Sequence, residues 1–176
     1  RLFAEGTFNA AFIPSYSGEL AKNKINADKF AHNVFNLLFI ILLFLVFVAE
    51  IFMPQLIFLI APGFYYDPEK LKLAVDLSRI TFPFLFFICL ASFFGAILNS
   101  YNKFAAAAAA PIILNVILII SLILSLMLSL DYAKQLSYGV TIAGIIQLFF
   151  LIFVTKSFYK PTLHFSLRLN NKVRFF

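Results

Sequence analysis

The sequence predicts an all-α integral membrane protein, a polytopic helix bundle with about five transmembrane helices. Three observations lead to this fold class. Hydrophobic residues make up 62% of the chain and charged residues only 12%, whereas about a quarter of a soluble domain is charged. The apolar residues gather into long runs. Most charged residues lie between those runs, as expected for the connectors of membrane-crossing helices.

Four apolar runs are long enough to cross the membrane. Each approaches or exceeds the ~18–20 residues that span about 30 Å of hydrocarbon. Their backbone must be helical, because lipid offers no partner for free N–H and C=O groups. A fifth and weaker candidate opens the chain. The predicted helices cover about residues 1–21, 34–60, 80–98, 105–130 and 138–156, so residues 1–160 are expected to form one transmembrane bundle.

The predicted connectors differ in character. Residues 22–33 hold three lysines, while residues 99–104 and 130–135 form tight connections. The 61–79 connector carries the turn signals Pro62-Gly63 and Asp67-Pro68. Apolar positions within PEKLKLAVDLSR then predict a short interfacial helix that leads into the next span.

The tail, residues 161–176, alternates apolar and polar side chains up to residue 169. This period of two indicates an extended or interfacial connector on the cytoplasmic side, leading toward a helix beyond the segment. The chain begins at Arg1 and shows no basic leader with a cleavage site, so we expect no signal peptide. We interpret the chain as an internal piece of a longer protein.

Basic residues predict the orientation of the bundle. If the 22–33 connector is cytoplasmic, nine basic residues lie on that side: Lys22, Lys24, Lys29, Lys103, Lys156, Lys160, Arg168, Lys172 and Arg174. Four lie on the other: Lys70, Lys72, Arg79 and Lys134. The excess favours a cytoplasmic 22–33 connector. The net charge of +6 is therefore a topology signal. No basic patch interleaved with aromatic residues indicates a nucleic-acid partner.

The opening segment carries charge inside an apolar run. On a helical wheel, an arc of about 80° holds four polar-capable side chains: Arg1, Glu5, Asn9 and Tyr16. Arg1 and Glu5 are four residues apart and can pair. Ionisable groups in spanning helices usually face a bundle interior or a water-filled cavity. The alternative is that Arg1 lies at the membrane interface and Glu5 only neutralises it.

No catalytic or metal-binding pattern is visible. The single cysteine, Cys89, lies in an apolar run and is expected to be a small buried hydrophobe. His32 and His164 fall in connectors and are expected to be solvated. There is no HExxH, GxSxG or glycine-rich phosphate loop. We therefore expect no enzyme, no cofactor and no metal.

Two further features interrupt the apolar runs. Glu50 is either a proton-linked carboxylate or a group at the outer interface or against a partner helix. The six alanines at 105–110 predict close packing with a neighbouring helix. Pro111, which follows them, is expected near a helix start. Asn115 is expected to bond across to another helix or line a cavity.

Several segments resemble one family in the same order along the chain. The opening RLFAEGTFNAAFIP resembles the second transmembrane helix of the MviN/MurJ family, the lipid II flippases of bacterial cell-wall synthesis. IAPGF (60–64) resembles the end of the third helix. The segment at 80–104 resembles the fourth helix and its GAILNxxNKF ending. APIILN (110–115) and GVTIAGIIQL (139–148) resemble the fifth and sixth helices.

The resemblance implies a two-lobed transporter of the multidrug/oligosaccharidyl-lipid/polysaccharide exporter superfamily. This segment would be its second to sixth helices, most of the first lobe, in the bacterial inner membrane. The implied activity is flipping of lipid-linked peptidoglycan precursor (lipid II) by alternating access. The implied partners are lipid II and membrane lipids, with cell-wall synthesis proteins left open.

The resemblance also implies roles for residues. Arg1 and Glu5 match cavity positions of the family, and Gly6 follows them as their small neighbour. Asn9 stands where the family has varied small or polar residues. Together, the predicted substrate-binding residues are Arg1, Glu5, Gly6 and Asn9. Glu50 stands where an apolar residue is expected, which weakens a coupling role. A diphosphate headgroup cannot cross hydrocarbon alone and needs a cavity with fixed positive charge, and arginine binds phosphate oxygens bidentately.

Two other functions remain open from the sequence. A drug or small-molecule antiporter of the same superfamily would share the fold and bind a hydrophobic cation in place of a lipid diphosphate. A structural membrane subunit would transport nothing, and its polar residues would serve packing only.

Overall fold

The computed structural model describes residues 7–160, and the secondary structure in that range is entirely helical. The elements are α1 (Thr7–Lys22), α2 (Lys24–Ile51), α3 (Met53–Ile60), the short 3₁₀ helix η2 (Pro62–Tyr66), α4 (Pro68–Thr81), α5 (Phe84–Ser100), α6 (Phe104–Leu128) and α7 (Tyr132–Thr155). Four stretches are long and apolar enough to cross a membrane: Lys24–Ile51, Pro68–Ser100, Phe104–Leu128 and Tyr132–Thr155. The predicted all-α membrane fold is confirmed.

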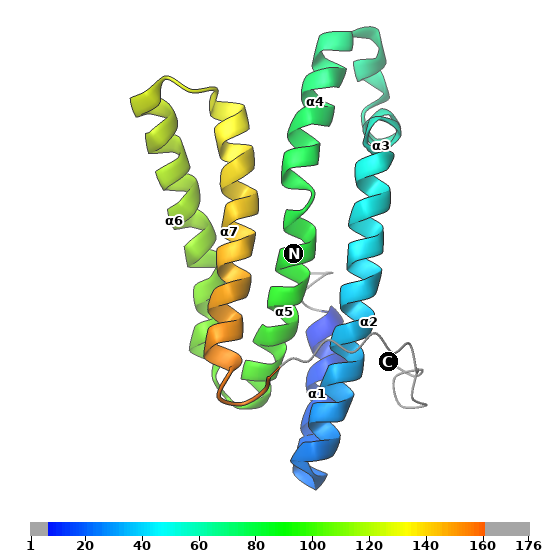
Figure 1. Cartoon of the computed structure of the whole chain (residues 1–176), viewed down its shortest axis with the longest axis vertical. Helices are drawn as coiled ribbons and strands as arrows, with labels where there is room; N and C mark the ends of the chain where they lie inside the picture. The colour runs from blue at the N-terminus through cyan, green and yellow to red at the C-terminus, as the bar shows by residue number, and fades with distance from the viewer. Residues whose placement is uncertain (1–6, 161–176) are drawn as a thin grey trace.

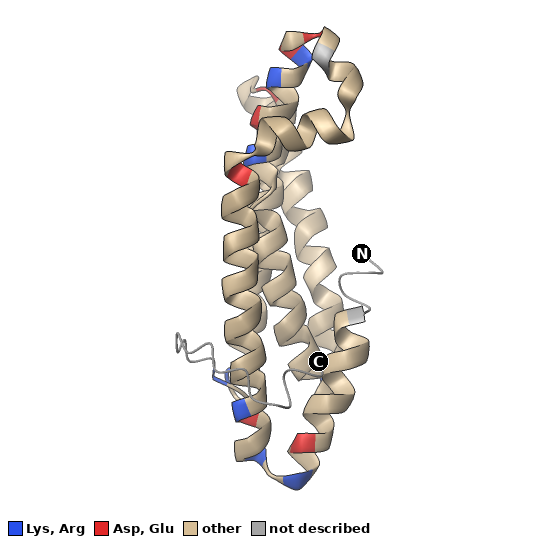
Figure 2. Ribbon diagram, turned by 90° about the vertical axis from the view of Figure 1, so that its right-hand side faces the viewer, with Lys and Arg blue, Asp and Glu red and all other residues tan. Residues whose placement is uncertain are grey.

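The helices run up and down the bundle in sequence order (Figure 1). The α1–α2 turn, the α5–α6 turn and the end of α7 lie at one end, and the α3–α4 and α6–α7 connections lie at the other. Among residues 7–160, charged residues gather toward the two ends and leave the middle of the bundle free of them (Figure 2). This distribution is what a hydrocarbon layer around the middle requires, because a charge there is expensive.

The α1–α2 connection is shorter than predicted. Residues 22–33 were expected to form a connector, but α2 already begins at Lys24. Asn23 caps it, because its side chain accepts a hydrogen bond of 2.8 Å from the Ile25 N–H. The first turns of α2 are amphipathic: Ala27, Phe30, Ala31 and Val34 are buried, while Lys24 and Lys29 are exposed. The lysines suggested a loop, but the helical spacing of the apolar residues decides the structure.

Prolines divide two of the long runs. The predicted 34–60 helix ends at Ile51, and α3 restarts at Met53 with Pro54 in its first turn. A proline at this position costs the helix no hydrogen bond, because the N–H group that it lacks would be unpaired there anyway. Pro83 likewise separates α4 from α5. The helix predicted within residues 68–79 is present as α4, and Asp67 caps it by accepting a 3.2 Å hydrogen bond from the Lys70 N–H.

The expected position of Pro111 is wrong. It lies inside α6, directly after the alanines and at the start of the third turn, and α6 continues to Leu128. Membrane helices tolerate internal proline because neighbouring helices and waters can satisfy the freed carbonyl, here that of Ala107. Asn115 is exposed on α6. The helix ends at Ser129, whose positive φ of 51° stops it in the left-handed region.

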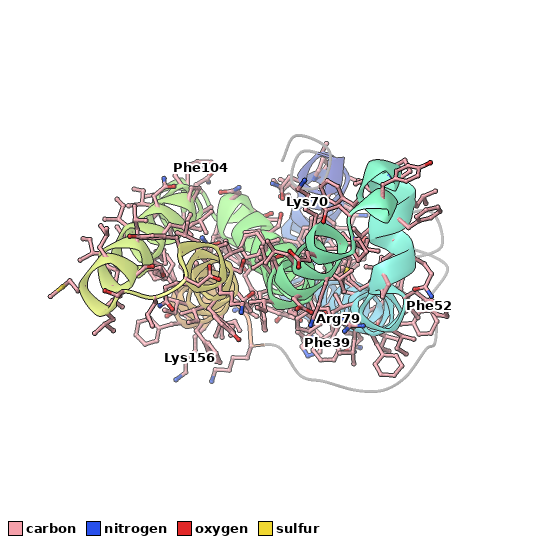
Figure 3. All side chains as sticks on the ribbon, turned by 90° about the horizontal axis from the view of Figure 1, so that it is seen from above. Phe39, Phe52, Lys70, Arg79, Phe104 and Lys156 are labelled. Carbon is pink, nitrogen blue, oxygen red and sulfur yellow. The ribbon has the colours of Figure 1, made fainter. Side chains whose placement is uncertain are left out.

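An aromatic cluster forms the centre of the fold. Phe12 of α1 contacts Phe30 of α2 and Phe93 of α5, with ring centroids 5.8 and 5.2 Å apart. These three rings are nearly inaccessible. By contrast, large apolar side chains cover the outer faces, among them Phe52 and Phe104 at the periphery in Figure 3. Such a surface is stable against lipid and would be unusual in water.

The α6–α7 and α4–α7 contacts depend on small and polar residues. A Cβ added to Gly139 of α7 would overlap the hydroxyl of Ser121 on α6. The Thr141 hydroxyl donates a hydrogen bond to the backbone carbonyl of Ile80, near the α4–α5 break. Small residues let membrane helices approach closely, and hydroxyls bond across them. This packing places α7 against α4, α5 and α6.

Candidate functional site

Of the four residues predicted to form a substrate site, Asn9 is within the described part of the chain. It lies in the first turn of α1. Arg1, Glu5 and Gly6 lie outside the described residues. The geometry of the site is therefore built outward from Asn9.

Asn9 borders a polar cavity between helices. The cavity has a volume of about 80 Å³, and its walls come from α1, α5, α6 and α7. The Asn9 Oδ1 atom is buried and has no hydrogen-bond partner among the described residues. The structure thus places this predicted site residue against a cavity, with a free acceptor atom.

Three polar residues that sequence reasoning missed share this cavity: Ser92, Asn99 and Gln147. Each has at least one buried polar atom without a partner in residues 7–160. Ser92 and Asn99 lie seven residues apart on α5 and so share a face of that helix. The sequence did contain a signal for these three residues, because each is a polar residue inside a strongly apolar run. The neighbours of those residues could not be deduced from one helix.

Tyr16 does not belong to this polar group. It was predicted on the same stripe as Asn9, but its side chain is completely buried, and its ring stacks on Phe12 with centroids 5.4 Å apart. Its hydroxyl lies 3.5 Å from that of Tyr101 at the end of α5. The stripe therefore divides: Tyr16 packs α1 into the aromatic core, while Asn9 faces the cavity.

A second polar group lies near the basic end of the bundle. The Nδ1 atom of His32 is 3.0 Å from the Asp28 carbonyl oxygen, and its ring meets Tyr159 edge-on at 5.2 Å. The expectation of a solvated connector histidine is wrong, because α2 includes His32 and the chain after α7 covers it. Burial raises the pKa of Tyr159 above its ordinary value, and the nearby Asp28 carboxylate adds to the shift.

Glu50 lies in the last turn of α2. Its Oε1 atom is buried without a hydrogen-bond partner within the described residues, and Arg79 on α4 is the opposite charge that acts on it. This position matches the expectation of a group facing a neighbouring helix. Cys89 is half-buried beside the aromatic cluster. Across residues 7–160, no three His, Cys, Asp or Glu side chains gather as a metal site.

A family model for the lipid II flippase MurJ matches residues 1–175. The chain belongs to the lipid II flippase MurJ family. The resemblance seen in the FAEG and GAILN segments is confirmed, and with four membrane-competent stretches the chain is part of a multi-pass membrane protein.

Relatives from several bacteria carry the name probable lipid II flippase MurJ. The protein of Rickettsia prowazekii is 43% identical over 167 residues, which is 95% of this chain and 32% of the relative. That of Rhizobium tropici is 43% identical over 153 residues, covering 84% of this chain and 29% of the relative. The protein of Buchnera aphidicola subsp. Acyrthosiphon pisum is 35% identical over 153 residues, which is 85% of this chain and 30% of the relative. The chain thus spans about a third of the length of these MurJ relatives.

Proposed function

We propose that the longer protein containing this segment flips lipid-linked peptidoglycan precursor across the bacterial inner membrane by alternating access. The observation that carries the proposal is the match of the MurJ family model to nearly the whole chain. The segment would form most of the first lobe, residues 1–160, with residues 161–176 leading to the next helix.

The charge pattern supports the orientation in this proposal. In the described residues, six lysines lie toward the end of the bundle that holds the α1–α2 turn: Lys22, Lys24, Lys29, Lys103, Lys156 and Lys160. Within residues 7–160, only two acids, Glu19 and Asp28, lie there. Because basic loops stay on the cytoplasmic side, we assign this end to the cytoplasm. The opposite end then faces the compartment where the wall is assembled.

The start of α1 is the part of the segment proposed to meet the substrate. Arg1 and Glu5 precede Asn9 at helical spacing. We propose that Arg1 binds the diphosphate through its guanidinium, because arginine remains charged in an apolar environment and offers a planar fork of donors. Glu5 holds Arg1 in place when the site is empty, since an unpaired charge there is costly. Gly6 leaves room for the headgroup, and Asn9 adds a polar contact.

The test is complementation of a strain depleted of its own lipid II flippase. The full-length gene is supplied as wild type, Arg1→Ala, Glu5→Ala or Asn9→Ala, with equal membrane levels verified by immunoblot. The matched control is Lys22→Ala, because Lys22 is a highly exposed charge at the far end of the same helix. We expect loss of rescue for Arg1→Ala and Glu5→Ala, weakened rescue for Asn9→Ala, and full rescue for Lys22→Ala.

Two results would contradict the proposal. If wild type fails to rescue while it restores tolerance to a hydrophobic cation, the protein is a drug antiporter. If wild type rescues and both charge variants rescue equally well, the protein is a flippase but the assigned site is wrong. Lipid II accumulating on the cytoplasmic face after depletion provides a direct measure of the step.

A further inference from the structure

The cavity beside Asn9 contains more unpaired polar atoms than a packed membrane bundle should tolerate. Gln147 is the strongest case, because its side chain is only 1% exposed and both its Oε1 and Nε2 atoms lack partners within residues 7–160. Asn9, Ser92 and Asn99 each add an unpaired oxygen. Buried polar groups without partners are strongly unfavourable, most of all where no bulk water is near. Something must complete their hydrogen bonds.

The cavity itself indicates what that ligand is. We propose that it is a binding site for a small cluster of water molecules, which bridges α1, α5 and α7. Its volume of about 80 Å³ is several times the space that one water needs. A ligand here must donate to the carbonyl oxygens of Asn9 and Asn99 and accept from the Gln147 amide. Water does both, and it can adopt the geometry that each group requires.

The chemistry of the lining disfavours ions as the occupant. Among residues 7–160, no carboxylate, imidazole or thiolate lines the cavity, so these residues would leave a cation uncompensated in a medium of low dielectric constant. A cation would also face the Gln147 Nε2–H₂ donors. Among residues 7–160, no lysine or arginine lines the cavity to bind an anion. Water is a neutral donor–acceptor and requires no counter-charge from these residues.

Small residues and a proline account for the space. A Cβ added to Gly95 of α5 would lie 3.6 Å from the Cβ of Ala107 on α6, so the two helices approach with no large side chain between them. Pro111 leaves the Ala107 carbonyl without its usual N–H donor, and both residues line the cavity. Asn99 lies in the last turn of α5, beside the basic end of the bundle.

Radiolytic labelling of the full-length protein in nanodiscs tests the proposal. X-ray pulses generate hydroxyl radicals from bound water, and these oxidise side chains in contact with it. Leu151 lines the cavity and Leu90 does not, yet each is 2% exposed. We expect several-fold more oxidation at Leu151 than at Leu90. Equal, background oxidation of both leucines would overturn the proposal, because the cavity would then be dry or filled by another part of the protein.

Variants and salt distinguish water from any other occupant of the cavity. Gln147→Leu removes two of the partners of the water and should reduce Leu151 oxidation toward the level of Leu90. Gln135→Leu is the matched control, since it makes the same change on α7 outside the cavity, and it should leave the ratio unchanged. An unchanged ratio in Gln147→Leu would contradict the site. Protection of Leu151 by NaCl relative to choline chloride would show a cation there and would equally overturn the proposal. The wild-type comparison remains decisive if a variant misfolds.

Discussion

Replacing Gly139 with alanine measures how closely α7 packs against α6. The added Cβ would overlap the Ser121 hydroxyl and would lie 3.0 Å from the Ser121 Cβ and 3.6 Å from the Leu118 Cδ2. Rotation of Ser121 relieves the overlap with the oxygen but leaves its Cβ in place. Carbon atoms attract best at about 3.5–4.0 Å, so the two helices must separate by a few tenths of an ångström. The loss of packing contacts would extend along the whole interface between α6 and α7.

Two opposing terms set the magnitude. Overpacking a tight interface typically costs about 1–3 kcal/mol. Alanine gains about 0.8–1.0 kcal/mol over glycine in helix propensity. The expected net effect of Gly139→Ala is thus a loss of about 0–2 kcal/mol. Gly18→Ala is the matched control, because nothing lies within 4 Å of a Cβ added there, and it should gain the propensity term alone.

The assay is reversible unfolding of the purified full-length protein in mixed micelles, monitored by circular dichroism. We expect Gly139→Ala to be less stable than Gly18→Ala by about 1–3 kcal/mol. Adding Ser121→Gly to Gly139→Ala removes the opposing Cβ and should recover most of the loss, which appears as a coupling energy in a double-mutant cycle. If Gly139→Ala were as stable as Gly18→Ala, the close approach of α6 and α7 would be refuted.

Two further substitutions test bonds seen in the fold. Thr141→Val removes the hydroxyl that bonds the Ile80 carbonyl and should lower the free energy of unfolding by about 0.6–1.7 kcal/mol. Thr141→Ser keeps a hydroxyl and should retain most of that stability. An equal loss of stability in both variants would contradict the hydrogen bond. Asp131→Ala removes the carboxylate that accepts hydrogen bonds of 2.9 and 3.2 Å from the N–H groups of Ala133 and Lys134. It should destabilise α7 by about 1 kcal/mol, seen as faster amide exchange in its first turn, whereas Asp131→Asn should keep the cap, and unchanged exchange in Asp131→Ala would count against it.

The membrane class and the spans could be predicted because both depend on local properties. Hydrocarbon thickness sets the helix length and lipid forbids free backbone groups, so apolar runs such as 105–130 predict helices wherever they pack. Helix α4 was also predictable, since the Asp67-Pro68 start signal and the apolar spacing after it are local to this segment.

The start of α2 and the position of Pro111 were not predictable in this way. Lysines near Asn23 suggested a loop, but Phe30 and Val34 bury one face of those turns against the rest of the bundle. Helix α6 continues past Pro111, because the surroundings of a membrane helix can satisfy the carbonyl that a proline frees. At the start of α2, a tertiary contact therefore outweighs a local preference.

By itself, the sequence determined that this protein crosses a membrane, where its main spans lie and that polar groups interrupt the first helix. Only the tertiary structure decided which polar groups meet. Hydropathy cannot make that choice, because lipid solvates every apolar face alike and provides no signal for which face turns inward. Packing of α1, α5, α6 and α7 brings Asn9 to Ser92, Asn99 and Gln147, and the same packing sends Tyr16 into the aromatic core.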